Sequence, residues 1–566
     1  MTKAWVACPI RDPFCDLTSF LEHSRQFISN RVIVGDEVVY IGLQRRSGLI
    51  ISLDMPQAFS PYELGLVLLA CFILFKLLRR GPSLPLPPGP KGWPIVGNAF
   101  EMPKSHLWRT FSDWGDKWGP IMSVKVLGTP FIIISDPLIA EGLLGKTGSL
   151  YADRPTMEMA NLTGWDRALS GARYNERFRE YRKLIGRVIG TRGNMVKFYP
   201  VEDFQANMFL KRVFTEPDDP AAATRKTAGA MVLHLTYGYK IKEEGTDPFV
   251  QLADHAMEQF SDITRPGAYM VDIFPFLKHI PAWFPLAYFK RRAAECVGPC
   301  NDIADIPFDY VKNQLARGEE NNSYAADLLK DQSLSAAKLE DLKWSAASFY
   351  AAGSDTTVSV VYAYIMAVCI YPEVQEKAQA EVDAVVGTDR LPSFRDRSSL
   401  PYVGAVVKEL YRWLPIVPLS VPHRAMRDSV YKGYFIPKDS LIFTNVWKFM
   451  HSPKEYKDPY TFNPERFLGP NPEPDPFDRG LFGYGRRVCP GTHLADVSVW
   501  INIVKAVAGL QISRALDGNG KPIIPTPETT DGVIVRPIPF KCVIKPRSER
   551  VLELLEEALK EGEDVN

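Results

Sequence analysis

The sequence has no CxxC pair. Its eight cysteines are scattered at positions 8, 15, 71, 296, 300, 369, 489 and 542 of 566 residues. Structural zinc sites and redox dithiols usually need closely paired cysteines, so neither kind of site is indicated. Scattered cysteines in a long chain are typical of free thiols in a reducing compartment.

Net charge is also almost absent. The 67 Lys and Arg residues balance 66 Asp and Glu residues, which leaves a formal net charge of +1. Nucleic-acid binding depends on clustered basic charge, so the balance argues against a nucleic-acid partner. Apolar residues, in contrast, are plentiful: 46% of the chain is hydrophobic and 11% is aromatic. A chain of this length and composition can bury a large core.

The apolar run near the N-terminus is shorter than the roughly 20 residues that a membrane-spanning helix needs. It reads LGLVLLACFILF at residues 64–75, and after Lys76 two leucines extend it to Arg79 and Arg80. Flanking residues can add length, and a lysine side chain can reach the headgroups. We therefore expect residues 62–80 to form one transmembrane anchor, with a buried helix as the alternative. Basic residues on its C-terminal side favour a cytosolic body.

Residues 1–54 contain no long apolar run and no signal-peptide pattern. From Met55 onward, the chain has a few polar residues, the apolar run, two arginines and then prolines, the usual order in an anchored cytosolic enzyme. We expect residues 1–54 to be an N-terminal extension that comes from an overlong gene model. Recovery of peptides from this segment, by mass spectrometry of the native protein, would contradict the hypothesis.

A proline-rich linker at residues 82–98 is predicted to be extended and stiff, because proline fixes φ and removes backbone donors. The body at residues 99–547 reads as mainly α with small β-sheets. We expect strands at four short apolar stretches: Ile121–Val126, Phe131–Ile134, Val533–Val535 and Lys541–Ile544. The acidic tail at residues 548–566 is either a short amphipathic helix or a solvated end.

The stretch from Trp344 to Tyr371 carries one charge, Asp355, and could be taken for a second membrane span. Its interior reads AAGSDTT, and a carboxylate flanked by hydroxyls is costly in lipid. We predict a long helix through the core of a globular body instead.

The most specific motif is FGYGRRVCPG at residues 482–491, which is followed by a helical apolar pattern. The residues of this motif suit a cysteine thiolate that binds the iron of haem, a flat macrocycle. Glycines let the backbone approach the macrocycle closely, and a helix N-terminus stabilises the thiolate. An axial thiolate helps a haem iron to cleave the O–O bond. For a cysteine without such surroundings, the ordinary interpretation is a small buried hydrophobic residue.

The motif matches the haem-binding loop of the cytochrome P450 superfamily at every fixed position: Phe482, Gly485, Arg487, Cys489 and Gly491. The resemblance extends from about Pro87 to Arg547. It implies the cytochrome P450 fold, with one large haem domain behind the N-terminal anchor. It also implies haem b as cofactor, with Cys489 as the axial metal ligand and Arg487 beside a haem propionate.

Two further motifs resemble the family's conserved structural set. Glu409 and Arg412 match E-x-x-R, whose charges share one face of a helix, and Arg466 in PERF is expected to join the pair. The implied role is structural, because breaking a buried ion network leaves an uncompensated charge.

AAGSDTT resembles the family's oxygen-activation motif. The resemblance implies that Thr356 hydrogen-bonds the oxygen being activated and that Asp355 relays protons from solvent. Threonine hydroxyls that bond back to helix carbonyls would open a notch there. The alternative is a kinked helix with satisfied polar groups.

The propionate partners follow from weaker matches. YNERFREYRK at residues 174–183 resembles the family's W-x-x-x-R helix, with Phe178 at the tryptophan position and Arg182 after it. Phenylalanine lacks the indole N–H, which removes one donor. VPHR resembles the strand that reaches the other propionate, and His423 is the expected contact, with a surface histidine as the alternative.

The sequence is similar to fungal microsomal members, especially those of mushroom-forming fungi. This similarity implies a single-pass protein of the endoplasmic reticulum membrane with a cytosolic catalytic domain. The chain has no flavin or NADPH module, so electrons are expected from NADPH through a separate NADPH–cytochrome P450 reductase that docks near Arg486.

The expected reaction inserts one atom of O₂ into a small lipophilic substrate: a secondary metabolite, a steroid or a xenobiotic such as a polycyclic aromatic. No charged group in the expected pocket would hold a carboxylate or an amine; its lining is Met157–Trp165, Phe349, Ala352, Ile416–Leu419 and Ile534–Val535. Two alternatives are a haem-thiolate isomerase or dehydratase, and a non-catalytic haem sensor.

Overall fold

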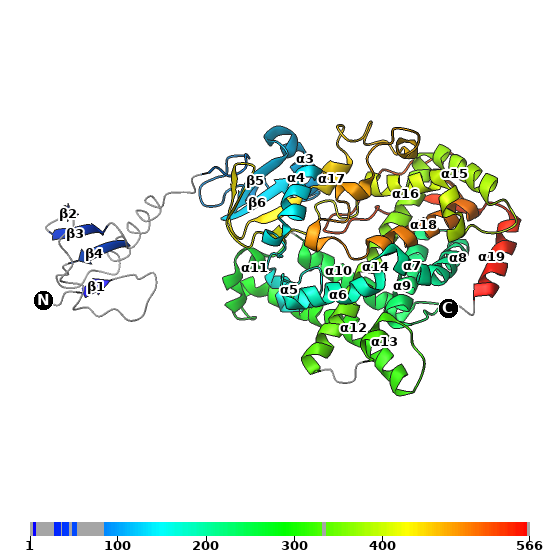
Figure 1. Ribbon diagram of the computed structural model, residues 1–566, viewed down its shortest axis with the longest axis horizontal. Coiled ribbons are helices and arrows are strands. Elements are labelled where there is room, and N and C mark those ends of the chain that lie inside the picture. The colour runs from blue at the N-terminus through cyan, green and yellow to red at the C-terminus, as the bar shows by residue number, and fades with distance from the viewer. Residues whose placement is uncertain are drawn as a thin grey trace. The chain divides into compact units, whose positions relative to one another are not determined.

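Figure 1 shows the computed structural model of the chain, which divides into two units, Met1–Ser83 and Leu84–Asn566. The structure describes residues 84–265, 267–330 and 335–562, and four strands before them. These strands form an antiparallel sheet in the order β1-β4-β3-β2: β1 (Ala4–Val6), β2 (Ile28–Val34), β3 (Glu37–Gln44) and β4 (Gly48–Leu53). The predicted anchor at residues 62–80 lies outside the described residues.

The second unit is mainly helical, as predicted. Its longer helices are α3 (Leu107–Trp118), α6 (Glu176–Ile189), α8 (Tyr199–Thr215), α9 (Pro220–Tyr237), α10 (Pro248–Thr264), α12 (Tyr288–Ala316), α14 (Ala336–Ile370), α15 (Pro372–Val385), α16 (Pro401–Trp413), α18 (Thr492–Gly509) and α19 (Glu549–Gly562). The shorter ones are α4 (Pro137–Ala140), α5 (Glu158–Thr163), α7 (Arg192–Met195), α11 (Met270–Ile273), α13 (Tyr324–Leu328) and α17 (Val446–Met450).

Three small sheets accompany the helices. The largest has the order β5-β6-β10-β7 and joins β5 (Ile121–Val126), β6 (Thr129–Ile134), β10 (Leu441–Thr444) and β7 (His423–Arg424). The β6–β10 pair is parallel and the other two pairs are antiparallel. In Figure 1 this sheet lies at one end of the second unit, with α3 packed beside β5 and β6. The two-stranded sheets are β8 (Ser429–Tyr431) with β9 (Tyr434–Ile436), and β11 (Leu510–Arg514) with β12 (Cys542–Pro546).

Three of the four strand predictions are confirmed, with β12 beginning one residue later than expected. The prediction of a strand at Val533–Val535 is wrong. This segment follows the turn at Gly532 (φ +133°), and the backbone N–H of Val535 donates to the Ile416 carbonyl (2.8 Å). One such hydrogen bond does not make a strand, although the side-chain pattern resembles one.

Helix α14 is the predicted core helix. Among the described residues it is the one helix that is long and apolar enough to cross a membrane, but 78% of its most apolar window is buried inside the protein. Its first half, up to Ala351, packs into one hydrophobic cluster with α9, α10 and α12. Its second half, from Val360, packs into another cluster with α8, α16 and α18. Residues 352–357 therefore lie between the two clusters.

The proline-rich segment forms no helix or strand over residues 85–92 and then turns at residues 93–97, where Trp93 and Gly97 exchange two backbone hydrogen bonds. It is bound to the body. The carbonyl of Pro88 accepts a hydrogen bond from the Ser123 backbone N–H (2.8 Å), and the carbonyl of Pro85 accepts one from Phe435 (2.8 Å). Proline lacks a donor but keeps its carbonyl acceptor, which explains how this segment docks. This segment therefore contacts β9 through Pro85 and β5 through Pro88.

The acidic tail adopts the helical alternative. Val551, Leu554 and Leu555 are buried on one face of α19, which packs against α8. The other face is exposed and charged.

Candidate functional site

The cysteine motif forms a loop that leads into α18. The backbone N–H of Cys489 donates to the Phe482 carbonyl (2.8 Å), and the Thr492 hydroxyl donates to the Cys489 carbonyl (2.9 Å). Helix α18 begins at Thr492, so the thiol lies just before the positive end of an 18-residue helix. The Cys489 side chain is exposed, so a group bound from outside the loop can reach the sulfur.

The groups around Cys489 have opposite effects on the pKa of its thiol. Although solvent reaches the side chain, protein packs densely around the sulfur, and this desolvation raises the pKa of the Cys489 thiol. The backbone N–H of Gly491 and, to a smaller extent, the Arg182 guanidinium lower the pKa. The loop therefore supplies part of what a thiolate needs, and a metal cation at the sulfur would supply the rest.

Gly485 fixes the path of the loop. Its φ is +54°, and a Cβ atom there would lie 2.3 Å from the carbonyl oxygen of Leu144. Both the conformation and the close approach require glycine.

Replacing Gly485 by alanine should destabilise the loop by about 2 kcal/mol or more, because alanine disfavours positive φ and its Cβ would collide with backbone. The measurement is the thermal unfolding midpoint together with haem content. Gly404→Ala in α16 is the matched control, because nothing lies within 4 Å of the new Cβ. We expect it to be neutral or to stabilise by up to about 1 kcal/mol. Equal midpoints for both variants would contradict the steric argument.

Arg487 lies behind the cysteine loop and is buried. Its Nε donates to the Ala152 carbonyl (2.6 Å) and its Nη2 to the Ala172 carbonyl (2.7 Å). Its guanidinium lies 3.7 Å from the centroid of the Phe178 ring. Phe178 thus supports Arg487 through a cation–π contact that the sequence comparison did not predict. The third nitrogen, Nη1, is buried and has no hydrogen-bond partner in the described part of the chain.

A second buried arginine, Arg154, was not predicted as part of the site. Its Nη1 donates to the carbonyls of Val421 (2.5 Å) and Pro422 (2.9 Å). Burial and then the positive charge of Arg487 hold the pKa of Arg154 well below its usual range. Burial also lowers the pKa of Arg487, to about 10.

The nearby carboxylate, Asp153, opposes the fall in the pKa of both arginines, but its single charge cannot balance both. It already binds Arg173 (2.8 Å) and Arg424 (2.7 Å). Arg154 and Arg487 therefore leave an excess of buried positive charge, which is costly unless an anion balances it. A group that carries two carboxylates would supply that negative charge.

His423 is buried and is not the surface histidine of the alternative interpretation. Its Nδ1 lies 2.8 Å from the Tyr151 carbonyl, so Nδ1 carries the proton. Burial and the charge of Arg154 hold the pKa of His423 well below its usual range, and Nε2 of the neutral ring is then an acceptor. A direct hydrogen bond to a carboxylate would need a second proton on the ring. Arg154 is therefore a further candidate partner for an anion, and the assignment of His423 to a propionate stays a prediction.

Arg182 lies on the cysteine side of the site. Its Nη1 donates to the carbonyl of Val488 (2.5 Å), and its charge acts on the Cys489 thiol. This hydrogen bond from Arg182 holds the loop at Val488, the residue before the cysteine. Arg486 is exposed and contacts the hydroxyl and ring of Tyr174.

The predicted ion network is present. The two oxygens of Glu409 accept from Nε (2.6 Å) and Nη2 (2.8 Å) of Arg412, and both side chains are fully buried. Nε of Arg466 donates to the same carboxylate (3.1 Å), as predicted. The remaining donors of Arg412 bind the carbonyls of Met450, Pro459 and Thr461. The network therefore ties α16 to the segments on either side of η9 (Pro464–Phe467).

The middle of α14 has the back-bonded threonine that the prediction of a notch rests on, and we call residues 352–357 the notch below. The Thr356 hydroxyl donates to the carbonyl of Ala352 (2.9 Å), and Ala352 itself is exposed although most of this helix is buried. Oδ1 of Asp355 lies 3.7 Å from Nη1 of Arg536. Burial raises the pKa of Asp355, while Arg536 and then Arg225 oppose that rise.

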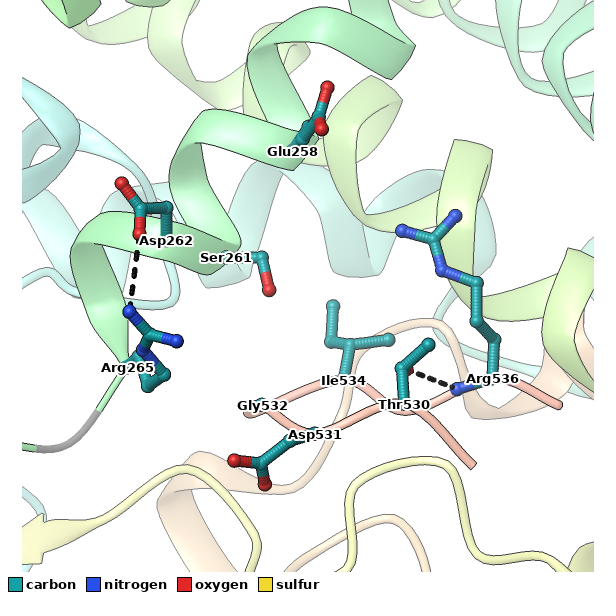
Figure 2. Close-up of a pocket in the computed structure, with 9 residues that line it drawn as sticks. All are labelled: Glu258, Ser261, Asp262, Arg265, Thr530, Asp531, Gly532, Ile534 and Arg536. Atoms are coloured by element: carbon teal, nitrogen blue, oxygen red, sulfur yellow. Dashed lines mark hydrogen bonds and ion pairs between the residues drawn. The ribbon is translucent and has the colours of Figure 1, made fainter. Parts of the chain in front are cut away.

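A cavity of about 250 Å³ lies between α10 and the C-terminal hairpin, which we define as residues 528–538 (Figure 2). It is lined by Glu258, Ser261, Asp262, Arg265, Thr530, Asp531, Gly532, Ile534 and Arg536. A smaller, mostly apolar cavity shares Ser261 and Ile534 with it and reaches Asp355. Of the residues predicted to line the substrate pocket, Ile534 is the one that lines these two cavities. The prediction of a pocket without charged groups therefore stays a prediction.

The sequence of the chain matches the family described as Cytochrome P450 over residues 87–541. It is 43% identical over 500 residues to cytochrome P450 monooxygenase 208 of Postia placenta, which covers 87% of this chain and 97% of the relative. It is 40% identical over 507 residues to cytochrome P450 monooxygenase claR of Ampulloclitocybe clavipes. The aligned part covers 89% of this chain and 94% of that relative. The chain belongs to the cytochrome P450 family. A third relative, the multifunctional cytochrome P450 monooxygenase af510 of Aspergillus fumigatus, is 37% identical over 514 residues, covering 87% and 96%.

Cytochrome P450 enzymes bind haem through a cysteine thiolate, and this chain is a monooxygenase of that family. The relatives' names favour this activity over the isomerase, dehydratase and sensor alternatives. The residues present fit haem: the accessible thiol of Cys489 can meet the iron, and the buried charge of Arg154 and Arg487 suits the two propionates.

Proposed function

We propose that the chain uses Cys489 as the haem ligand and oxidises a lipophilic substrate with electrons from NADPH, delivered by a separate reductase. The observation that carries this proposal is the accessible thiol of Cys489 just before the N-terminus of α18, two residues after the buried Arg487, whose Nη1 has no hydrogen-bond partner among the described residues. Arg487 and Arg154 would hold the propionates, with Phe178 supporting Arg487. Haem, when bound, supplies the activation of O₂.

The chain's own contribution to the reaction is to position groups and move protons. One oxygen atom of O₂ enters the substrate and the other becomes water, which consumes two electrons and two protons. Asp355 can exchange protons with solvent through the cavities beside it and pass them to the Thr356 hydroxyl. Thr356 now donates to the Ala352 carbonyl, so it must leave that acceptor to donate a proton into the notch.

Replacing Thr356 by alanine should uncouple NADPH use from product formation, because the hydroxyl that passes protons is lost. We expect a several-fold fall in product per NADPH and a matching rise in hydrogen peroxide. Ser359→Ala is the control, because Ser359 also bonds back to a carbonyl of α14, that of Asp355, but is fully buried. Unchanged coupling in Thr356→Ala, or equal loss in both variants, would count against the role.

The proposed substrate class rests on the apolar residues around Asp355, since the smaller cavity there, of about 10 Å³, is itself too small for a substrate. Met257, Phe260 and Ile534 line it next to Asp355 and favour an apolar body, such as a secondary metabolite, a steroid or a polycyclic xenobiotic. The test is to express the chain with a fungal reductase and to screen lipophilic compounds by mass spectrometry for a gain of one oxygen. Absence of both product and substrate-dependent NADPH use across the screen would overturn the proposal.

The proposed membrane anchor and the proposed reductase contact belong to the same proposal, because both would bring the catalytic domain to its source of electrons. A single-pass anchor at residues 62–80 would hold the catalytic domain on the cytosolic face of the endoplasmic reticulum, beside the reductase. Exposed Arg486 is the candidate contact on the cysteine side. Membrane fractionation of the full chain and of a chain that begins at Leu84 tests the anchor; equal recovery of both in the membrane fraction would contradict it.

A further inference from the structure

The C-terminal hairpin, residues 528–538, is held together by its own backbone. The N–H of Thr530 donates to the carbonyl of Arg536 (2.9 Å), and the N–H of Ile538 donates to the carbonyl of Glu528 (3.1 Å). At the tip, Gly532 lies against α10, because a Cβ atom there would be 3.2 Å from the Ser261 hydroxyl. The hairpin thus closes one side of the cavity in Figure 2.

One end of the hairpin is anchored to α3. The backbone N–H of His106 donates to the Asp531 carboxylate (3.1 Å), and the His106 ring contacts the Thr529 carbonyl (3.2 Å). Arg109 and Glu528 form an ion pair (2.8 Å) between half-exposed side chains. These contacts fix the hairpin without touching α14.

The other contact of the hairpin is with the acid of the α14 notch. Nη1 of Arg536 lies 3.7 Å from Oδ1 of Asp355, which is beyond hydrogen-bond length, so the carboxylate can still bond other groups. The Asp355 side chain is 15% exposed and that of Arg536 is 37% exposed. Arg536 therefore connects a buried carboxylate to a wall of the open cavity, and Figure 2 shows its side chain extending away from the hairpin.

The other charged groups around Asp355 make Arg536 the critical cation. Arg225 faces it from α9, but no ion pair joins the two in the described residues, and its effect on the pKa of Asp355 is smaller than that of Arg536. Asp254 on α10 adds negative charge, and burial together with Asp355 raises the pKa of Asp254. Arg536 has the larger lowering effect on the pKa of Asp355, and Arg225 has the larger lowering effect on the pKa of Asp254.

We propose that Arg536 is a positioning residue for Asp355, through which the C-terminal hairpin controls proton supply to the notch. This inference rests on the proposed role of Asp355. The hairpin also lines the cavity. The same segment that meets the substrate would therefore set the protonation state of Asp355.

The first experiment measures the pair itself, without turnover. Thermal stability is compared across pH for the wild type, Asp355→Asn, Arg536→Gln and the double variant. We expect Arg536→Gln to destabilise more when Asp355 is intact than in the Asp355→Asn background. Arg536 lowers the folded-state pKa of Asp355, so this difference should be present at neutral pH and vanish as the pH falls and the carboxyl protonates. Additive effects at every pH would overturn the proposal.

The second experiment measures product per NADPH against pH with a substrate found in the screen. Arg536→Gln should move the acidic limb to higher pH by about one unit or more, because the carboxyl then holds its proton more tightly. Arg536→Lys keeps the charge and should restore most of the profile. Arg109→Gln is the matched control, because it loosens the same hairpin at its other end and leaves Asp355 untouched.

The outcomes separate the two proposals. If Asp355→Asn leaves coupling unchanged, the proposed role of Asp355 is wrong. If Asp355→Asn uncouples the enzyme but Arg536→Gln behaves as wild type, only the inference about Arg536 is overturned. A shift in Arg109→Gln equal to that in Arg536→Gln would also overturn it, because general loosening of the hairpin would then explain both.

Discussion

Replacing Cys489 by serine is expected to abolish the Soret band that is characteristic of CO-bound ferrous thiolate haem. Serine keeps the shape of the loop, and the backbone hydrogen bond to Phe482 does not depend on the side chain. It cannot supply the sulfur that donates electron density to the iron. The measurement is the reduced, CO-bound absorption spectrum of the purified variant, together with its haem content.

Cys542→Ser is the matched control for this spectrum. Cys542 is a half-buried free cysteine on β12, away from the cysteine loop. We expect it to retain the thiolate-type band at full intensity. A retained band in Cys489→Ser, or its loss in Cys542→Ser, would make the ligand assignment wrong.

Replacing Glu409 by alanine is expected to yield little folded holoprotein. The change leaves Arg412 and Arg466 buried without their shared carboxylate, and breaking such a buried network costs about 3–5 kcal/mol. That is a large fraction of the stability of a typical domain. Holoprotein yield, the ratio of haem to protein and the thermal midpoint measure the effect.

Glu553→Ala is the comparison for the ion network. Glu553 pairs with Arg550 on α19, also three residues apart, but both side chains are well exposed. Exposed pairs contribute about 0–1 kcal/mol, so we expect near-normal yield. Normal haem content in Glu409→Ala would show that the network is dispensable.

The motifs that sequence reasoning predicted correctly have local or strongly ordered signals. Glu409 and Arg412 lie three residues apart on one helix, so their pairing follows from helix geometry. The cysteine loop carries its glycines, its arginine and the helix start within a few residues. Local chemistry of this kind can be predicted before any tertiary contact is known.

The missed features depend on contacts between distant segments. Arg536 meets Asp355 only because the C-terminal hairpin folds back over α14. Arg154 gained its importance from burial against Arg487, and nothing in its local sequence indicates that burial. Val533–Val535 has the residues of a strand, but the neighbouring turn at Gly532 leaves it no partner strand to pair with. Of the cavity lining, Ile534 was predicted, while Glu258, Met257 and Phe260 line the cavities only because α10 packs opposite the hairpin.

The position of residues 352–357 between two hydrophobic clusters has a mechanical consequence. Residues of α14 up to Ala351 belong to one cluster and residues from Val360 to the other, while the turn between them has exposed Ala352 beside buried Ser354 and Thr357. Thr356 can exchange the Ala352 carbonyl for another partner without disturbing either cluster. The helix is thus held on both sides of the one turn whose hydrogen bonds have to change for protons to move.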